Sequence, residues 1–235
     1  MKRLAIVLVA VALLAIVAWR ARPRPLEFAP SFGAALETAR ADDAWVVVHL
    51  RRADRPLGTK MDVETLADRS VQLGAHDGFV HVRLDAERDS AIVTPLAGDG
   101  AALSTLVVDR AGELVARADG FLGARELLAF LARVRAAKPR IEAAERALAA
   151  DSSGNESDGA QRLDLARSLD ALGASERAER EAARAELDLA TARNDMSRAL
   201  EAARFRAELL ERRGQLDAAA QLRRDADARY RPAPR

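Results

Sequence analysis

Residues 44–50 read Ala-Trp-Val-Val-Val-His-Leu, a nearly continuous apolar and β-branched run of strand length. Strands that are buried on both faces of a sheet have this composition, because helices or further layers cover both of their sides. The run therefore predicts a central strand of a sheet with helices packed against it.

Further segments on either side of this run complete the pattern of an α/β domain. Three more strands are predicted, and the turn Asp109-Arg110-Ala111-Gly112 joins the last two as a hairpin. The predicted strands are 79–84, 103–108 and 113–117, and the predicted helices are 31–41 with Ser31 as N-cap, a stretch around 61–71, and 124–137. This order predicts one mixed sheet flanked by helices.

The order and the local sequences resemble the thioredoxin-like family over residues 31–136. The segments that carry the resemblance are 46–50, 60–68, 78–85 and 104–115. On this resemblance Arg55-Pro56-Leu57-Gly58 stands where the family has Cys-x-x-Cys, so Arg55 and Gly58 replace the two thiols. His49 replaces a buried carboxylate, and Leu103 or Ser104 falls where the family has its cis-proline.

The whole chain of 235 residues contains no cysteine. The thiolate is the nucleophile of dithiol exchange, so this chain alone cannot carry out thioredoxin-type redox chemistry. No other catalytic motif is found, and we expect a protein that is not an enzyme and has no cofactor. Lys+Arg number 37 against 36 Asp+Glu, a balance that argues against a nucleic-acid binder.

Four basic residues surround the degenerate loop: Arg51, Arg52, Arg55 and Lys60. Arginines beside a helix N-terminus favour anions, which suggests a site for a phosphate, sulfate or carboxylate. The alternative is an ordinary solvated charged loop. His49 and His81 lie on neighbouring predicted strands, and we expect buried, hydrogen-bonded neutral imidazoles there rather than a metal site.

From residue 138 onward the sequence predicts only helices. Lys138-Pro139-Arg140 is expected to break the closing helix before a short helix at 141–150, a polar linker follows at 151–159, and four helices are predicted at 160–172, 175–191, 196–213 and 215–230. Gly173 precedes Ala178 by five residues, and Gly214 precedes Ala219 by the same interval. A tight glycine turn followed by a close-packing alanine resembles the tetratricopeptide hairpin. A plain helical bundle is the alternative.

The N-terminus predicts a membrane anchor. Met1-Lys2-Arg3 precedes an uninterrupted apolar run at residues 4–19, and arginines follow it without a good cleavage site. We therefore expect an uncleaved signal anchor in the inner membrane with the rest of the chain in a bacterial periplasm. Secretion after signal cleavage is the alternative.

These observations predict an anchor at 1–25, a thioredoxin-like domain at 26–137, a helix and linker at 138–159, and tetratricopeptide-like hairpins at 160–235. The expected function is a redox-inactive interaction module or scaffold for an unknown envelope protein. The alternative is an accessory subunit that presents substrates to a cysteine-bearing partner in thiol–disulfide exchange.

Overall fold

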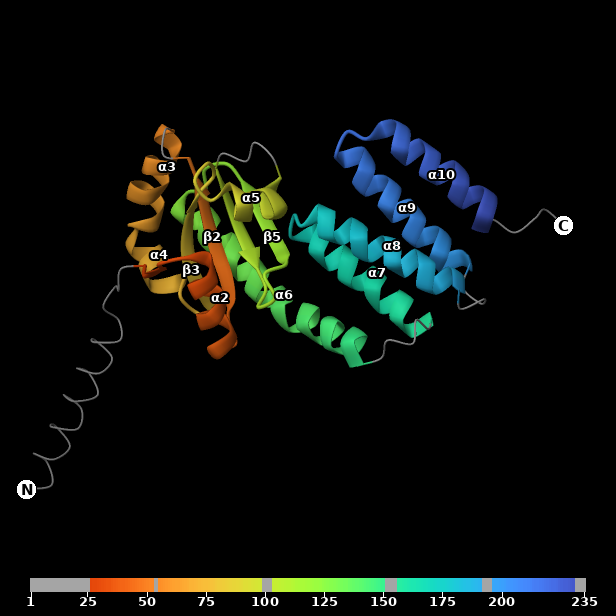
Figure 1. Cartoon of the computed structure of the whole chain (residues 1–235), viewed down its shortest axis with the longest axis horizontal. Coiled ribbons are helices and arrows are strands. Elements are labelled where there is room, and N and C mark those ends of the chain that lie inside the picture. The colour runs from red at the N-terminus through yellow and green to blue at the C-terminus, as the bar shows by residue number, and fades with distance from the viewer. Residues whose placement is uncertain (1–25, 53–54, 99–102, 151–155, 192–195, 231–235) are drawn as a thin grey trace, which may run out of the picture. The chain divides into compact units, whose positions relative to one another are not determined.

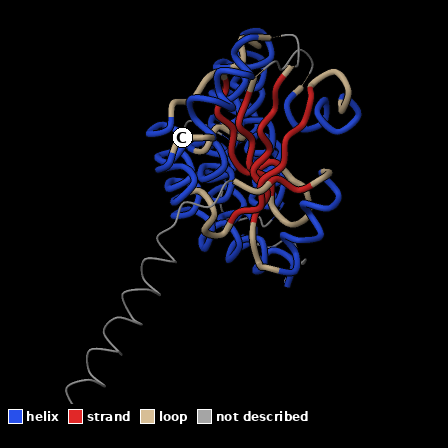
Figure 2. Tube along the Cα trace, turned by 90° about the vertical axis from the view of Figure 1, so that its left-hand side faces the viewer, coloured by secondary structure: helices blue, strands red, loops and turns tan. Residues whose placement is uncertain are grey.

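The computed structural model describes residues 26–52, 55–98, 103–150, 156–191 and 196–230 (Figure 1). Five strands form one sheet in the order β1-β3-β2-β4-β5. Figure 2 shows the strands in red with helices around them. Strand β3 runs parallel to β1 and β2, whereas β4 is antiparallel to β2. The strands are β1 Phe28–Ala29, β2 Trp45–Arg51, β3 Phe79–Asp85, β4 Ser104–Val108 and β5 Leu114–Asp119.

Six helical segments accompany the sheet: α2 Phe32–Ala41, α3 Pro56–Lys60, the π-helical η1 Met61–Leu66, α4 Arg69–Gly74, α5 Ser90–Ala97 and α6 Ala124–Ala150. Helix α2 begins where the sequence predicts, because the Ser31 hydroxyl accepts a hydrogen bond from the Ala34 amide at 3.2 Å. The mixed sheet with its helices fits the thioredoxin-like α/β domain that the sequence resembles.

Strand β2 is the centre of the core. Its residues from Trp45 to Leu50 are all buried, and Val46, Val47 and Val48 have no exposed surface. The strand lies between β3 and β4, so both of its edges are hydrogen-bonded and both of its faces are covered. The prediction of a doubly buried strand at 44–50 is confirmed.

Strand β1 is not among the strands predicted from the sequence. The strand has two residues, and Phe28 pairs with His81 while Ala29 pairs with Val82. Two residues are too few to show a periodicity, so only the parallel partner β3 makes this segment a strand.

The predicted break at Lys138-Pro139-Arg140 is wrong. Helix α6 runs through Pro139 to Ala150 as one helix. A proline inside a helix removes one hydrogen bond and costs about 3 kcal/mol or more. Val134 and Ile141, seven residues apart on one face of α6, are both fully buried. This burial on either side of the proline offsets the cost and keeps the helix continuous.

The chain divides into two compact units, each described here by itself. One comprises residues up to 112 together with 119–131, and the other comprises 113–118 together with the chain from 132 onward. Strand β5 therefore groups with the helical region, and α6 contributes to both units. In the described residues no helix is long and apolar enough to cross a membrane. The predicted anchor at 4–19 lies outside those residues.

The second unit is built from hairpins of antiparallel helices: α7 Glu156–Ala171, α8 Ser175–Thr191, α9 Met196–Arg212 and α10 Leu216–Tyr230. Their bounds agree with the four predicted helices to within four residues. Gly173 and Gly214 form the turns with φ of +85° and +77°, a conformation that favours glycine. Ala178 and Ala219 are both fully buried, as expected for small residues at a close approach of two helices.

The apolar core between the hairpins is made largely of small side chains. One cluster contains Leu163, Ala185, Leu189, Ala199, Ala202, Ala203, Ala226 and Tyr230. Alanine removes little apolar surface from water compared with leucine, since the hydrophobic free energy scales with the buried area. The helices of this unit therefore need other interactions to fix their positions.

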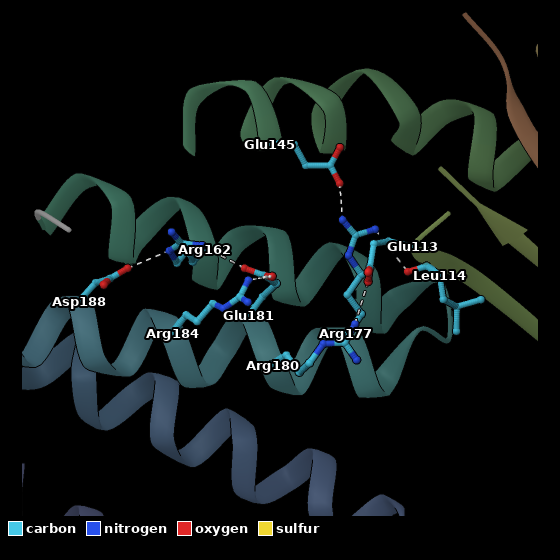
Figure 3. Close-up of polar contacts among 9 residues, drawn as sticks. All are labelled: Glu113, Leu114, Glu145, Arg162, Arg177, Arg180, Glu181, Arg184 and Asp188. Carbon is cyan, nitrogen blue, oxygen red and sulfur yellow. Dashed lines mark hydrogen bonds and ion pairs between the residues drawn. The ribbon is translucent and has the colours of Figure 1, made fainter. Parts of the chain in front are cut away.

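Buried and half-buried ion pairs between helices supply them. Arg162 of α7 reaches two carboxylates of α8, with Nε 2.8 Å from Asp188 and Nη1 3.3 Å from Glu181 (Figure 3). Glu186, also on α8, accepts from Arg206 of α9 at 2.6 Å and from the Tyr230 hydroxyl of α10 at 3.0 Å. One carboxylate thus joins three helices through charge-assisted hydrogen bonds.

The turn between α7 and α8 packs directly on strand β5. The Arg117 amide donates to the Leu172 carbonyl at 2.9 Å. A Cβ placed on Gly173 would lie 2.5 Å from the Arg117 carbonyl oxygen, so only glycine permits this approach.

Helix α8 adds side-chain contacts to this strand, to Glu113 just before it and to α6. Arg177 donates to Glu145 of α6 at 2.5 Å and to the Leu114 carbonyl at 3.4 Å, and Arg180 pairs with Glu113 (Figure 3). The backbone of the strand is thereby hydrogen-bonded to the helical region at two places.

The two turn glycines provide a matched test of this docking. Gly214 has a positive φ, and a Cβ added there would meet no atom within 4 Å, so Gly214→Ala meets backbone strain alone. We expect a loss of about 1–2 kcal/mol in the free energy of unfolding. Gly173→Ala has the same backbone strain and also displaces the turn from Arg117. We therefore expect a loss of about 2–4 kcal/mol in the free energy of unfolding.

Chemical denaturation of the full chain, followed by circular dichroism, measures both variants. Equal losses at Gly173 and Gly214 would show that the approach to Arg117 contributes nothing beyond the turn conformation.

Candidate functional site

The degenerate loop enters helix α3 at the position that the resemblance assigns to the thiols. Arg55 is the N-cap residue in an extended conformation, and Pro56 occupies the first turn. Arg55 is exposed, whereas Gly58 is buried with Arg51 Cβ 3.2 Å from the place where its own Cβ would be. The second thiol position thus has little room for a side chain.

The basic residues of the expected anion site contact different partners. Arg51 pairs with Asp62 at 2.6 Å, Arg52 pairs with Glu87, and Lys60 lies 3.7 Å from Glu64. The Lys60 ammonium also lies 4.9 Å from the centre of the Phe121 ring. Three of the four basic side chains thus each have a carboxylate partner, and the anion site stays a prediction.

Beneath the loop, His49 of β2 and His81 of β3 form a buried hydrogen-bonded pair. His49 Nε2 lies 3.0 Å from His81 Nδ1, and the rings stack with an interplanar angle of 14°. His81 Nε2 lies 2.9 Å from the Ala75 carbonyl oxygen. The expectation of buried, hydrogen-bonded imidazoles at these two positions is confirmed.

The carbonyl of Ala75 fixes the protonation pattern of both rings. A carbonyl oxygen only accepts, so Nε2 of His81 must carry a hydrogen and Nδ1 of the neutral ring is an acceptor. His49 Nε2 therefore donates to it, and His49 Nδ1 is left as a lone pair. This nitrogen has no hydrogen-bond partner among the described residues.

Burial opposes the charged form of both imidazoles. Desolvation lowers the pKa of His49 well below its usual value, and the charges of His81 and Arg83 act in the same direction. Desolvation lowers the pKa of His81 to about 4, against the opposing effect of the hydrogen bond to Ala75. Both rings are neutral at pH 7.

The space next to the pair is small. A cavity of about 10 Å³ is lined by residues that include His49, Asp62 and Arg83, and this volume accommodates one water molecule at most. The described residues contain no group of three or more His, Cys, Asp or Glu side chains that could hold a metal ion. The geometry here fits a packed interior rather than a substrate site.

Larger hollows lie in the helical unit. A hollow of about 340 Å³ is formed by Arg140, Ile141 and Ala144 of α6 with Asp164, Leu165, Arg167 and Ser168 of α7. A second, of about 520 Å³, is formed by Arg167 with Ser197, Leu200, Glu201, Arg204, Phe205 and Glu208 of α9. We call the two hollows together the helical groove.

Arg167 joins the two parts of the groove, since it lines both and pairs with Glu201 of α9. Buried apolar side chains such as Ile141 and Leu165 form its floor, and exposed charges of both signs form its walls. The sequence pattern indicates the turns and the packing alanines of this unit, but it does not mark the residues that line the groove. Their spacing signals only a helix, and the pairing of α6, α7 and α9 creates the concave surface.

Arg55 is exposed and Gly58 is buried, and this difference provides a test of the degenerate loop. The unmodified chain should show no insulin-disulfide reduction, because it has no thiol. Arg55→Cys changes an exposed residue and should alter the free energy of unfolding by no more than about 0.5 kcal/mol. Gly58→Cys should cost about 1–3 kcal/mol, since its Cβ crowds Arg51.

Urea denaturation of the two single variants and a turbidity assay of the unmodified protein measure these effects. Turnover by the unmodified chain would contradict the expectation that it has no thioredoxin-type redox activity. Equal stabilities of the two variants would contradict the crowding at Gly58.

No protein-family model and no curated protein matches the chain. A solved structure described as "DsbH Oxidoreductase" is similar to 49% of this chain and to 88% of its own length, with 18% sequence identity and a TM-score of 0.41. A likeness of this degree says nothing about activity or partners. This part of the chain is therefore characterised by its own features: a mixed sheet with the strand order given above, and a sequence without cysteine.

Proposed function

We propose that the chain is a non-enzymatic interaction module of the cell envelope, in which the helical groove binds a segment of a partner protein. The observation that carries this proposal is a pair of neighbouring hollows that share Arg167 and are lined by α6, α7 and α9.

The chemistry of the groove suits a peptide. Leu200 and Phe205 are half-buried and line the larger hollow, where they offer apolar surface. Arg140, Arg167 and Arg204 are balanced by the same number of carboxylates along the walls. A partner segment with apolar side chains between charges of both signs would match this pattern.

The glycine–alanine repeat supports a tetratricopeptide-like assignment for the two hairpins. Gly173 and Gly214 have the same left-handed turn conformation, and the alanine five residues later is fully buried in both cases. We further propose that the first unit is a redox-inactive thioredoxin-like scaffold, and that residues 4–19 anchor the chain in the inner membrane.

Photo-crosslinking in intact cells tests the groove. A photoreactive residue at Glu208, exposed on α9 and lining the groove, should capture an envelope protein. The same residue at Ala228, exposed on α10 and outside the groove, should capture far less of it. Enrichment of an oxidoreductase instead, through a photoreactive residue at the exposed Leu57, would support the accessory role in thiol–disulfide exchange.

A matched pair of charge reversals gives the control. Arg204→Glu changes an exposed residue of the groove, whose pair with Asp227 is exposed and worth at most about 1 kcal/mol. We expect it to lower the crosslinking yield at Glu208 at least about tenfold, a loss of about 1.4 kcal/mol in binding. Arg224→Glu makes the same change outside the groove and should leave the yield unchanged. Equal yields for both variants would contradict the proposal.

A further inference from the structure

We propose that the buried His49–His81 pair is an acid-sensitive latch on strand β1: proton uptake by the pair releases Phe28–Ala29 from β3. The latch is independent of the helical groove and lies entirely within the first unit. It rests on three features, namely the cover that β1 provides, the hydrogen-bond pattern of the pair and the charges around it.

Phe28 covers both imidazole rings. Its ring centre lies 5.8 Å from that of His49 and 6.4 Å from that of His81, and both contacts are edge-on. In the sheet Phe28 pairs directly with His81, so the two side chains point to the same face. Detachment of β1 would therefore open the pair to water.

Strand β1 is also the element of the sheet that is easiest to detach. It has two residues, lies at the end of the strand order and pairs only with β3. The Arg83 guanidinium adds a contact, 3.8 Å from the centre of the Phe28 ring. Short edge segments open at low free-energy cost compared with central strands.

While β1 is in place, protonation of the histidine pair is unfavourable. Within the described part of the chain, all ring nitrogens of the pair but one have a partner, and the free lone pair is Nδ1 of the enclosed His49. A proton on this atom would create a buried imidazolium, which costs free energy unless a charged or polar partner receives it.

Among the described residues that face the pair, no carboxylate is available to neutralise such a charge. Arg83 of β3 is cationic and His76 packs edge-on against His81. Asp62 of η1 lies at the same cavity, but Arg51 and Arg83 already bind its two oxygens. From β4 the residue opposite His49 is Thr105, which carries no charge and whose hydroxyl has no hydrogen-bond partner among the described residues. The buried residues of α2 are alanines.

The direction of the pH effect follows from linkage. In the closed state the pKa of His81 is about 4, and in a solvated state it approaches the ordinary value of about 6.5. Closure is therefore fully stabilised above about pH 6.5 and loses this stabilisation as the pH falls toward 4. At pH 4.5 the shift of this one group favours the released state by up to roughly 70-fold.

Site-directed spin labelling tests the latch, and the absence of cysteine makes the labelling specific. A label on Glu27→Cys, exposed next to β1, should become mobile as the pH falls from 7.5 to 4.5. A label on Glu37→Cys, exposed on α2, should not change. The transition should disappear when His49→Gln and His81→Gln are combined, because neither glutamine titrates.

Hydrogen–deuterium exchange of the protein with both histidines intact gives a second measurement, which does not depend on the folding of the double variant. After correction for the intrinsic rate, exchange of residues 26–30 should rise by tens of fold at pH 4.5. The latch is refuted by an unchanged Glu27 label together with unchanged exchange of 26–30. It is equally refuted if the Glu37 label becomes mobile over the same pH range, or if the transition persists without the histidines.

Discussion

The hydrogen bond from the Arg117 amide to the Leu172 carbonyl joins strand β5 to the first helical hairpin. It forms because Gly173 brings no Cβ to the Arg117 carbonyl, which lies 2.5 Å from where that atom would be. The outer edge of a sheet otherwise presents unpaired amides and carbonyls. The turn satisfies part of that edge, and Arg177 extends the contact to Leu114 and Glu145. The close approach of this hairpin to β5 therefore requires a glycine at position 173.

In the helical unit, arginine side chains hold the helices in position, a role that large apolar side chains have in many helical proteins. A core rich in alanine lets helices approach closely but stabilises them weakly. Arg162 between α7 and α8, and Arg206 with Tyr230 around Glu186, fix the helices through directed hydrogen bonds. Because a hydrogen bond has a preferred direction, these bonds restrict the relative positions of the helices more than apolar contacts do. The same arrangement places α6, α7 and α9 so that their faces form the helical groove.

The interior of the first unit contains two neutral histidines, His49 and His81. The Ala75 carbonyl sets the tautomer of His81, and His81 sets that of His49. The chain of hydrogen bonds ends at Nδ1 of His49, whose lone pair has no hydrogen-bond partner among the described residues. Such a pair is stable only while it stays neutral and enclosed, and the cover on it includes the two-residue strand β1.

The sequence by itself determined the elements whose residues follow a period: strand β2 from its valine run, α2 from Ser31, and the four helices of the hairpins. It also determined which chemistry is absent from the loop at Arg55 and Gly58, since that depends on residue type alone. Only the tertiary structure decided that α6 continues through Pro139, that Phe28–Ala29 is a strand, and that Gly173 contacts Arg117. The tertiary structure also decided where the helical groove forms and that Nδ1 of His49 has no hydrogen-bond partner among the described residues. Each of these depends on residues far apart in the chain, and a local pattern contains no information about which distant surface will cover it.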